Sequence, residues 1–165
     1  MSNIREHVEY HSNGNKKVVG TFKDEKQYGS WVFWYENDQK ESEGSFTNGK
    51  QYGPWIFWDE NGNKRMEVNY KLGKEDGECI TYHENGNKQS EGIYKNGEKN
   101  GKVKVYTEFG QLFIDINYKD GKRDGECITY HENGNKQSER IYKNGEKNGK
   151  LMVYNRDGTL KEERD

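Results

Sequence analysis

The chain has 165 residues and a net charge of −2, with 34% charged and only 28% hydrophobic residues. Globular domains are roughly 45–50% apolar, so this composition excludes a thick spherical core, and the interspersed charges exclude a basic surface for nucleic acid. Disordered chains are poor in aromatic residues, whereas 13% of this chain is Phe, Trp or Tyr, which indicates a fold that buries a thin aromatic layer.

A unit of 24 residues recurs along the chain without insertion. Three columns are rich in glycine: Gly29, Gly53, Gly77, Gly101, Gly125 and Gly149; Gly14, Asp38, Gly62, Gly86, Gly110, Gly134 and Gly158; and Glu25, Gly49, Gly73, Gly97, Gly121 and Gly145. Two columns are aromatic: Tyr10, Trp34, Trp58, Tyr82, Tyr106, Tyr130 and Tyr154; and Phe22, Phe46, Tyr70, Tyr94, Tyr118 and Tyr142. We therefore expect one repeat domain, residues 1–165, with partial units at 1–24 and 145–165 and full units at 25–48, 49–72, 73–96, 97–120 and 121–144.

From the N-terminus onward, each unit predicts two strands joined by a tight turn. In the unit that begins at residue 76, Cys79–His83 favours a strand, Glu84–Asn87 contains the Asn-Gly pair of a hairpin turn, and Lys88–Lys95 forms a second strand. Pro54 falls at a strand start, where proline is tolerated, and no segment has a helical apolar period. The predicted fold is all-β: about six tandem β-hairpin units in an elongated, twisted antiparallel meander, with about twelve strands spanning roughly 60 Å.

Side-chain alternation assigns the two faces of this predicted sheet. The positions of Val32 and Trp34 are apolar in almost every unit, so we expect this face to be the packed one, joined by the aromatic column that begins at Phe22. All four tryptophans fall between residues 31 and 58, and the opposite face carries large aromatic residues only in that region: Trp31, Phe33, Tyr35, Trp55 and Phe57.

Several motifs recur in each unit, such as Gly53-Pro54-Trp55 followed by Glu60-Asn61-Gly62-Asn63-Lys64, and Glu43-Gly44-Ser45-Phe46 followed by Asn48-Gly49-Lys50. From about residue 8 to residue 160 the pattern resembles the MORN repeat, and more closely its bacterial variant in the YwqK family of antitoxins. Glu67-Val68, Asp115-Ile116 and Glu139-Arg140 depart from the usual Glu-Gly. The resemblance implies a β-hairpin array that binds proteins, sometimes lipids, and that in some bacterial members neutralises a toxin made by the same cell.

The sequence contains no motif for catalysis, and we expect no enzyme, cofactor or metal site. A nucleophile elbow, a P-loop and a Gly-x-Gly-x-x-Gly motif are all missing. His83 and His131 follow Cys79 and Cys127 by four residues, roughly 13 Å along a strand, which is too far for one shared metal ion. The two cysteines would lie roughly 19 Å apart, whereas a disulfide needs Cα atoms within about 7 Å, so free thiols are expected.

The N-terminal aromatic group, Trp31, Phe33, Tyr35, Trp55 and Phe57, allows two interpretations. It packs either under the N-terminal segment, against Ile4 and Val8, or against a second layer of the same sheet. Alternatively, it forms a protein-binding patch, because Trp and Tyr dominate interface hot spots and contiguous exposed aromatic residues mark interaction sites.

The leading hypothesis is a non-enzymatic protein-binding module that blocks a toxin or effector enzyme by steric occlusion, as an immunity protein, antitoxin or inhibitor. A cytoplasmic location is expected, because residues 1–10 lack the apolar core of a signal peptide and no apolar run is long enough for a transmembrane segment. The abundance of Lys, Asn, Glu and Ile is typical of an AT-rich bacterial genome.

Two other classes of function stay open. The first is a lipid- or cell-wall-ligand-binding aromatic repeat protein, in which aromatic cages hold a quaternary ammonium group. The second is a passive scaffold. No direct nucleic-acid binding is expected. The unpaired edge strands of the predicted sheet also allow a homo-oligomer, in which the edge strands of two copies pair.

Overall fold

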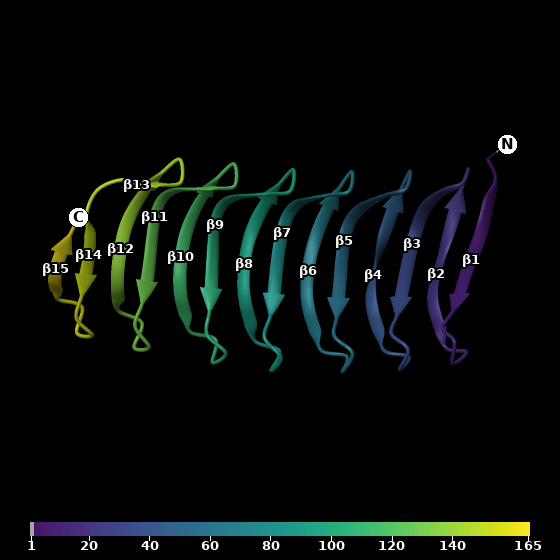
Figure 1. Cartoon of the computed structure of the whole chain (residues 1–165), viewed down its shortest axis with the longest axis horizontal. Helices are drawn as coiled ribbons and strands as arrows, with labels where there is room; N and C mark the ends of the chain where they lie inside the picture. Colours follow the sequence, from purple (N-terminus) through teal and green to yellow (C-terminus); the bar gives the residue numbers. More distant parts are fainter. Residues whose placement is uncertain (1) are drawn as a thin grey trace.

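The computed structural model describes residues 2–165, which form one antiparallel sheet of 15 strands and contain no helix. The strands are β1 (Ile4–Tyr10), β2 (Lys16–Lys23), β3 (Lys26–Trp34), β4 (Lys40–Thr47), β5 (Lys50–Trp58), β6 (Lys64–Lys71), β7 (Lys74–Tyr82), β8 (Lys88–Lys95), β9 (Glu98–Tyr106), β10 (Leu112–Lys119), β11 (Lys122–Tyr130), β12 (Lys136–Lys143), β13 (Glu146–Lys147), β14 (Leu151–Tyr154) and β15 (Leu160–Arg164). They lie side by side in chain order, except that β13 and β14 both pair with β12 (Figure 1). The predicted all-β hairpin meander is confirmed.

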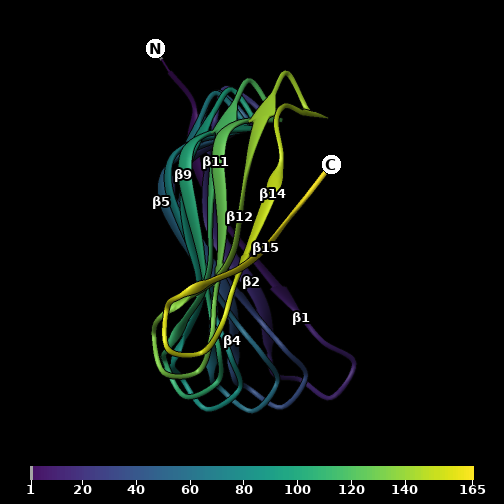
Figure 2. The ribbon, with the colours of Figure 1, turned by 90° about the vertical axis from the view of Figure 1, so that its left-hand side faces the viewer.

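The sheet is a single layer, and within residues 2–165 no second sheet or helix covers either face (Figure 2). The strands bow along their length and rotate progressively from β1 to β15, as the intrinsic twist of strands requires (Figures 1 and 2). A side chain can therefore be covered only by neighbours on its own face. The core is accordingly a thin layer that runs along the sheet, as in other repeat arrays.

The turn that joins the two strands of each hairpin, Asn-Gly in most units, is closed by two backbone hydrogen bonds. In the turn after β7, the His83 N–H donates to the Asn87 carbonyl and the Gly86 N–H donates to the His83 carbonyl, both at 2.9 Å. Gly86 has a φ of 85°, a left-handed conformation that glycine adopts without steric cost. Asp38 occupies this glycine column and keeps a positive φ of 67°, which a short polar side chain tolerates.

The structure overturns the predicted assignment of the two faces. Trp31 and Trp55 are each only 2% exposed, whereas Val32 and Trp34, on the face predicted to be packed, are only half-buried. The aromatic column that begins at Phe22 lies on the Trp31 face as well, because the Phe22 and Trp31 rings meet edge to face with their centroids 5.2 Å apart. The packed face is therefore the one that we expected to be open.

Cross-strand register explains the reversal. Trp31 pairs with Gly44, so Phe46, two residues further along β4, shares the face of Trp31. The composition of a column does not reveal this pairing, because a shift of one residue in a turn moves every side chain of the next strand to the other face. We call the face of Trp31 the tryptophan face, and the face that carries Trp34 and Glu67 the glutamate face.

The glutamate face is held together by a repeated set of three polar residues. Glu67 accepts hydrogen bonds from the Lys64 ammonium at 2.8 Å and from the Tyr82 hydroxyl at 2.7 Å. Equivalent sets are Lys88, Glu91 and Tyr106, and Lys136, Glu139 and Tyr154. The bonds from Lys64 and Tyr82 lower the pKa of Glu67, while burial and the bond to Glu67 raise the pKa of Tyr82 to about 12. Each set ties the second strand of one unit to the first strand of the next.

Candidate functional site

Two tryptophans of the tryptophan face lie directly on glycines of the preceding strand. A Cβ atom on Gly20 would be 2.1 Å from Cδ2 of Trp31, and one on Gly44 would be 2.2 Å from Cδ2 of Trp55. Both distances are far shorter than the roughly 3.5 Å of a normal carbon–carbon contact. Each glycine therefore leaves the space that one indole ring occupies.

In two later units the same contact is made by residues of exchanged size, whereas Gly92 still faces a larger residue, Val103. Val68 on β6 pairs with Cys79 on β7, and Ile116 on β10 pairs with Cys127 on β11. A large residue on the even-numbered strand thus meets a small thiol, where the first units place a glycine against a tryptophan. Both cysteines are free, and burial raises the pKa of the Cys79 thiol to about 11. A thiol with this pKa is a poor nucleophile at neutral pH, so its role is packing.

The two tryptophans organise a continuous aromatic cluster on β1 to β6. Phe22 and Phe46 meet the rings of Trp31 and Trp55 edge to face, with centroid distances of 5.2 and 5.0 Å. Phe33 and Phe57 stack on the same two indoles at 6.1 and 5.9 Å. His7 and Tyr70 extend the cluster at its two ends. We call these eight residues the aromatic cluster: His7, Phe22, Trp31, Phe33, Phe46, Trp55, Phe57 and Tyr70.

The structure places the two predicted tryptophans in the interior of the aromatic cluster. Trp31 and Trp55 are 2% exposed, so they form its base rather than an exposed patch. The predicted cover by Ile4 and Val8 is wrong, because these side chains are 62% and 42% exposed; His7 instead lies 5.7 Å from Trp31, centroid to centroid.

Two other predicted residues, Phe33 and Phe57, are half-buried members of the aromatic cluster that stack on the tryptophans. Their rings form part of the surface that the aromatic cluster exposes to solvent.

Tyr35, the fifth predicted residue, does not contact the aromatic cluster rings. It lies in the turn after β3, where its hydroxyl donates a hydrogen bond to the Trp58 carbonyl at 2.9 Å. Partial burial raises the pKa of this phenol. Tyr35 thus links two successive turns and is separate from the aromatic face.

Sequence reasoning missed His7, Phe22, Phe46 and Tyr70 as members of this site. The phenylalanines could have been found from the residue sizes in two columns eleven positions apart. In the units up to Ile116, where the first column has a small residue the second has a large one, and the reverse. Gly20 and Gly44 precede Trp31 and Trp55 by eleven residues, and Val68 stands in the same relation to a cysteine. This exchange of size places the two columns in contact and therefore on one face.

A hollow of about 310 Å³ lies next to the aromatic cluster at its N-terminal end. His7, Val18, Phe22, Trp31 and Phe33 contribute to its wall. The rings offer apolar contact area, and charged side chains, among them Glu9, Lys17 and Glu41, line the rest of the wall. Among residues 2–165, no three His, Cys, Asp or Glu side chains are grouped closely enough to hold a metal ion. The same residues include no helix suited to crossing a membrane.

Comparison with known protein families agrees with the repeat period. Five tandem segments match the family described as MORN repeat variant: residues 27–48, 51–72, 75–96, 99–120 and 123–144. Each segment begins in an odd-numbered strand and ends in the turn that follows the next even-numbered strand. No curated protein matches the sequence.

Proposed function

Because the chain belongs to the MORN repeat variant family, we propose that it is a non-enzymatic protein-binding module that blocks its partner by covering it. The resemblance to the YwqK-family antitoxins points to a toxin or effector enzyme as the partner, and to an immunity protein, antitoxin or inhibitor acting in the cytoplasm. The observation that carries the proposal is the aromatic cluster, which lies on a sheet face that no other element of residues 2–165 covers.

Phe33 and Phe57 are the residues of this face best suited to bind a protein. Both rings are half-buried and stack on the buried indoles of Trp31 and Trp55, so little side-chain entropy remains to be lost on binding. Phe33 also lies 6.2 Å from Trp55, centroid to centroid, and Phe57 stacks on the same indole, so the two phenylalanines belong to one continuous surface. Large, preorganised aromatic residues beside a hollow are typical of interface hot spots.

The single-layered sheet explains how binding would inhibit the partner. Its strands are hydrogen-bonded without a break from β1 to β12, so the array behaves as one stiff surface. A stiff surface that binds beside an active site excludes substrate by its bulk and needs no catalytic group of its own. The conformational entropy lost by such a binder is small, which favours tight association.

The proposal is tested with the double variant Phe33→Ala/Phe57→Ala. The native partner is captured from a lysate of the source cells, identified by mass spectrometry, purified and titrated against each variant by calorimetry. Loss of two hot-spot rings should weaken binding at least about 30-fold, equivalent to roughly 2 kcal/mol. Replacing Trp31 and Trp55 would be a poorer test, because both are buried and their loss would destabilise the array.

Phe109→Ala is the matched control, since Phe109 is 87% exposed in a turn far from the aromatic cluster. It should bind like the unmodified chain, and circular dichroism should show both variants folded. Unchanged affinity in the double variant would remove the aromatic cluster from the interface. If the array captures no stoichiometric protein but binds liposomes or choline resin, the lipid or cell-wall alternative replaces the proposal.

A further inference from the structure

One row of the tryptophan face changes its charge along the array. In each unit, a residue of this row pairs across the strands with an aromatic residue of the column that begins at Phe22: Gln27 with Phe22, Gln51 with Phe46, Glu75 with Tyr70, Lys99 with Tyr94, Arg123 with Tyr118, and Lys147 with Tyr142. Directly paired residues point to the same face of a sheet. The row is therefore neutral or acidic in the first three units and cationic in the last three. We call Lys99, Arg123 and Lys147 the cation row.

The charge of the cation row is not neutralised by the sheet itself. None of its three residues takes part in an ion pair within residues 2–165. Glu75 precedes the row by one unit, and Glu162, on β15 at the C-terminal end of the face, already pairs with Arg164. Positive charge is therefore left over on this part of the tryptophan face.

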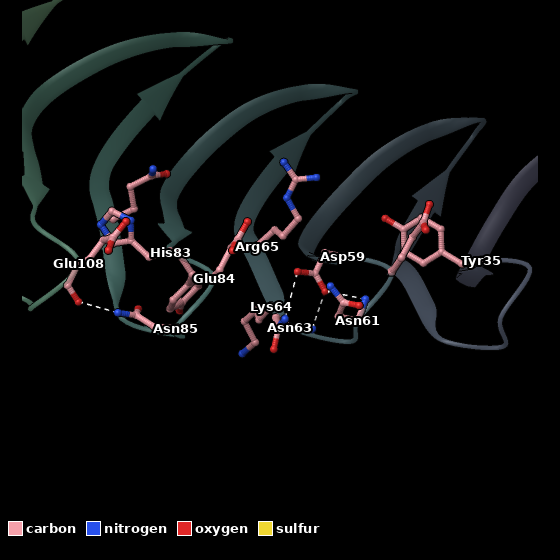
Figure 3. A pocket seen from close by; sticks show the side chains of 13 residues that line it. Tyr35, Asp59, Asn61, Asn63, Lys64, Arg65, His83, Glu84, Asn85 and Glu108 are labelled. Carbon is pink, nitrogen blue, oxygen red and sulfur yellow. Dashed lines mark hydrogen bonds between the residues drawn. The ribbon is translucent and has the colours of Figure 1, made fainter.

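Other cations of the array share their surface with carboxylates. On the glutamate face, the Lys88 ammonium lies 2.8 Å from the Glu91 carboxylate. At the turns after β5 and β7, Arg65 lines the same cleft as the carboxylates of Asp59 and Glu84 (Figure 3). In both places opposite charges already lie together, so neither place calls for an added anion.

The tyrosines of the tryptophan face hold the cation row in place. Nζ of Lys99 lies 5.3 Å from the centre of the Tyr118 ring, and Cζ of Arg123 lies 5.3 Å from the centre of the Tyr142 ring. A ring attracts a cation but carries no net charge, so it orients the side chain without neutralising it. Arg123 and Lys147 are exposed and Lys99 is half-buried, so the row is open to a ligand.

A fourth cation, Arg140, is buried on the same face without a partner. It precedes Tyr142 by two positions in β12 and pairs across the strands with Cys127. Arg140 is only 8% exposed, and its Nε atom has no hydrogen-bond partner within residues 2–165. A buried guanidinium without an acceptor is costly, because it has lost its hydration. An anion that supplies an acceptor offsets this cost.

Arg140 is the single difference between two otherwise identical segments of the chain. Residues 76–102 and 124–150 differ only in Gly92 versus Arg140. β9 is continuous, whereas its counterpart is divided into β13 and β14, and residues 148–150 between them are in no strand (Figure 1). A Cβ atom at Gly92 would already lie 2.8 Å from Cγ2 of Val103 on the next strand, so an arginine at this place forces the next strand away. A residue that breaks the repeat at a cost in strand pairing is expected at functional sites.

We propose that the cation row, together with Arg140, binds an acidic segment of the protein partner. The inference rests on the proposed protein-binding function, since the carboxylates belong to the partner. Nucleic acid and anionic membranes attract proteins with a broad excess of positive charge, whereas this chain has a net charge of −2 and these cations form one narrow row. The aromatic cluster occupies the N-terminal half of the same face, so one partner contacts both surfaces.

The spacing of the cation row defines the segment that fits it. Its residues lie on β9, β11 and β13, and strands two apart are separated by roughly 10 Å. A chain in the polyproline II conformation advances about 3.1 Å per residue with three residues per turn, so every third side chain points the same way at intervals of roughly 9 Å. A segment in this conformation with glutamate at every third position therefore places successive carboxylates against Lys99, Arg123 and Lys147. The guanidinium of Arg123 receives its carboxylate through two parallel N–H bonds.

The inference is tested on the full chain with a peptide of three Glu-Pro-Pro repeats, acetylated and amidated at its ends, whose prolines favour the polyproline II conformation. The titration is followed in NMR spectra at low ionic strength by the backbone amide signals of β9 to β13 and by the Nε–H signal of Arg140. Saturable shifts of these signals are expected, with a dissociation constant on the order of 1 mM. A peptide of three Gln-Pro-Pro repeats has nearly the same shape without the charges and should bind at least about tenfold more weakly.

Two variants test the assignment with residues that the repeat already contains. The triple variant Lys99→Gln/Arg123→Gln/Lys147→Gln copies the glutamine found at this place in the first two full units, and should weaken peptide binding at least about tenfold. Arg140→Gly copies Gly92 and should weaken binding at least about threefold, with the loss of the shifted Nε–H signal.

The matched control is Lys71→Gln/Lys95→Gln/Lys119→Gln, which removes the same charge from the opposite face. Each of these lysines follows a tyrosine of the tryptophan face by one residue in its strand, so it points to the glutamate face. The control should bind the acidic peptide within about twofold of the unmodified chain. Circular dichroism should show that all variants are folded.

Equal binding of the glutamine peptide, or an equal loss of binding in the control, would overturn the inference, because neither result requires the cation row. Tighter binding of phosphatidylserine vesicles or single-stranded DNA than of the acidic peptide, lost in the triple variant, would also overturn it, since the row would then recognise phosphates. The peptide probe needs no native partner and avoids Phe33 and Phe57, so such a failure would leave the test of the proposed function unaffected.

Discussion

Alanine at Gly44 should destabilise the sheet, and the same substitution should stabilise it once Trp55 is cysteine. A Cβ atom at Gly44 would lie 2.2, 2.3 and 2.5 Å from Cδ2, Cε2 and Cγ of Trp55. Normal carbon contacts are about 3.5–4.0 Å, so the indole would have to move by more than about 1 Å. Overpacking of this kind costs about 1–3 kcal/mol, and the high end is expected because Trp55 also contacts Phe46 and Phe57.

The Trp55→Cys background removes the cause of this clash. It copies Cys79, which faces Val68 in the following unit, and by analogy with Trp→Ala it should itself cost about 3–5 kcal/mol. With the indole gone, Gly44→Ala should stabilise the sheet by about 0.4–1 kcal/mol, because it restricts the unfolded chain and Gly44 does not have a positive φ. The effect of the alanine therefore changes sign, with a coupling energy of at least about 1.5 kcal/mol.

The four proteins of this double-mutant cycle are compared by urea unfolding followed by far-UV circular dichroism, with a check that the slope with urea stays constant. Gly92→Ala is the matched control. Its Cβ atom would come closer than normal contact to a single atom, the methyl carbon Cγ2 of Val103 at 2.8 Å, so a smaller loss than at Gly44 is expected. If Gly44→Ala destabilises both backgrounds equally, the glycine is not required by the tryptophan, and the reasoning from paired sizes fails.

Two further predictions concern the glutamate face and the hydrogen bonds between successive turns. Tyr82→Phe removes one of the two donors that lower the Glu67 pKa, and should cost about 1 kcal/mol at neutral pH. A carboxyl whose folded pKa is below its ordinary 4.5 stabilises above pH 4.5 and loses that contribution as the pH falls through the folded pKa. Urea midpoints should thus fall less steeply in acid for Tyr82→Phe than for the unmodified chain; equal slopes would contradict this. Asn85→Ala loses the bond to Glu108 and should speed amide hydrogen exchange in that turn, whereas Asn61→Ala, which loses no bond to the next turn, should change it little.

The hairpin array could be predicted from the sequence because its determinants are local. The Asn-Gly pairs require positive φ, and all the glycines of the column that begins at Gly14 have it. Because these turns are short, each strand pairs with the strand before it and the strand after it in the chain. The confirmed family and fold follow from this regularity, which repeats every 24 residues.

The identity of the packed face depended on tertiary structure. Trp31 and Trp34 are both large and aromatic, and only the pairing of Trp31 with Gly44 decides which indole is buried. Residue pattern alone does not determine this pairing, since side chains alternate with a period of two and a shift of one residue exchanges the faces.

The hydrogen bonds between successive turns likewise depended on an interaction between units. The sequence by itself determined that Asp59 lies in a turn, in a column otherwise held by histidine, tyrosine, threonine or asparagine. Only the folded array showed that the Asp59 carboxylate bonds within its own turn and leaves the next turn without donors. Turn conformation is set by a few consecutive residues, whereas the contact between turns requires side chains 23 residues apart to meet, as Asn85 and Glu108 do.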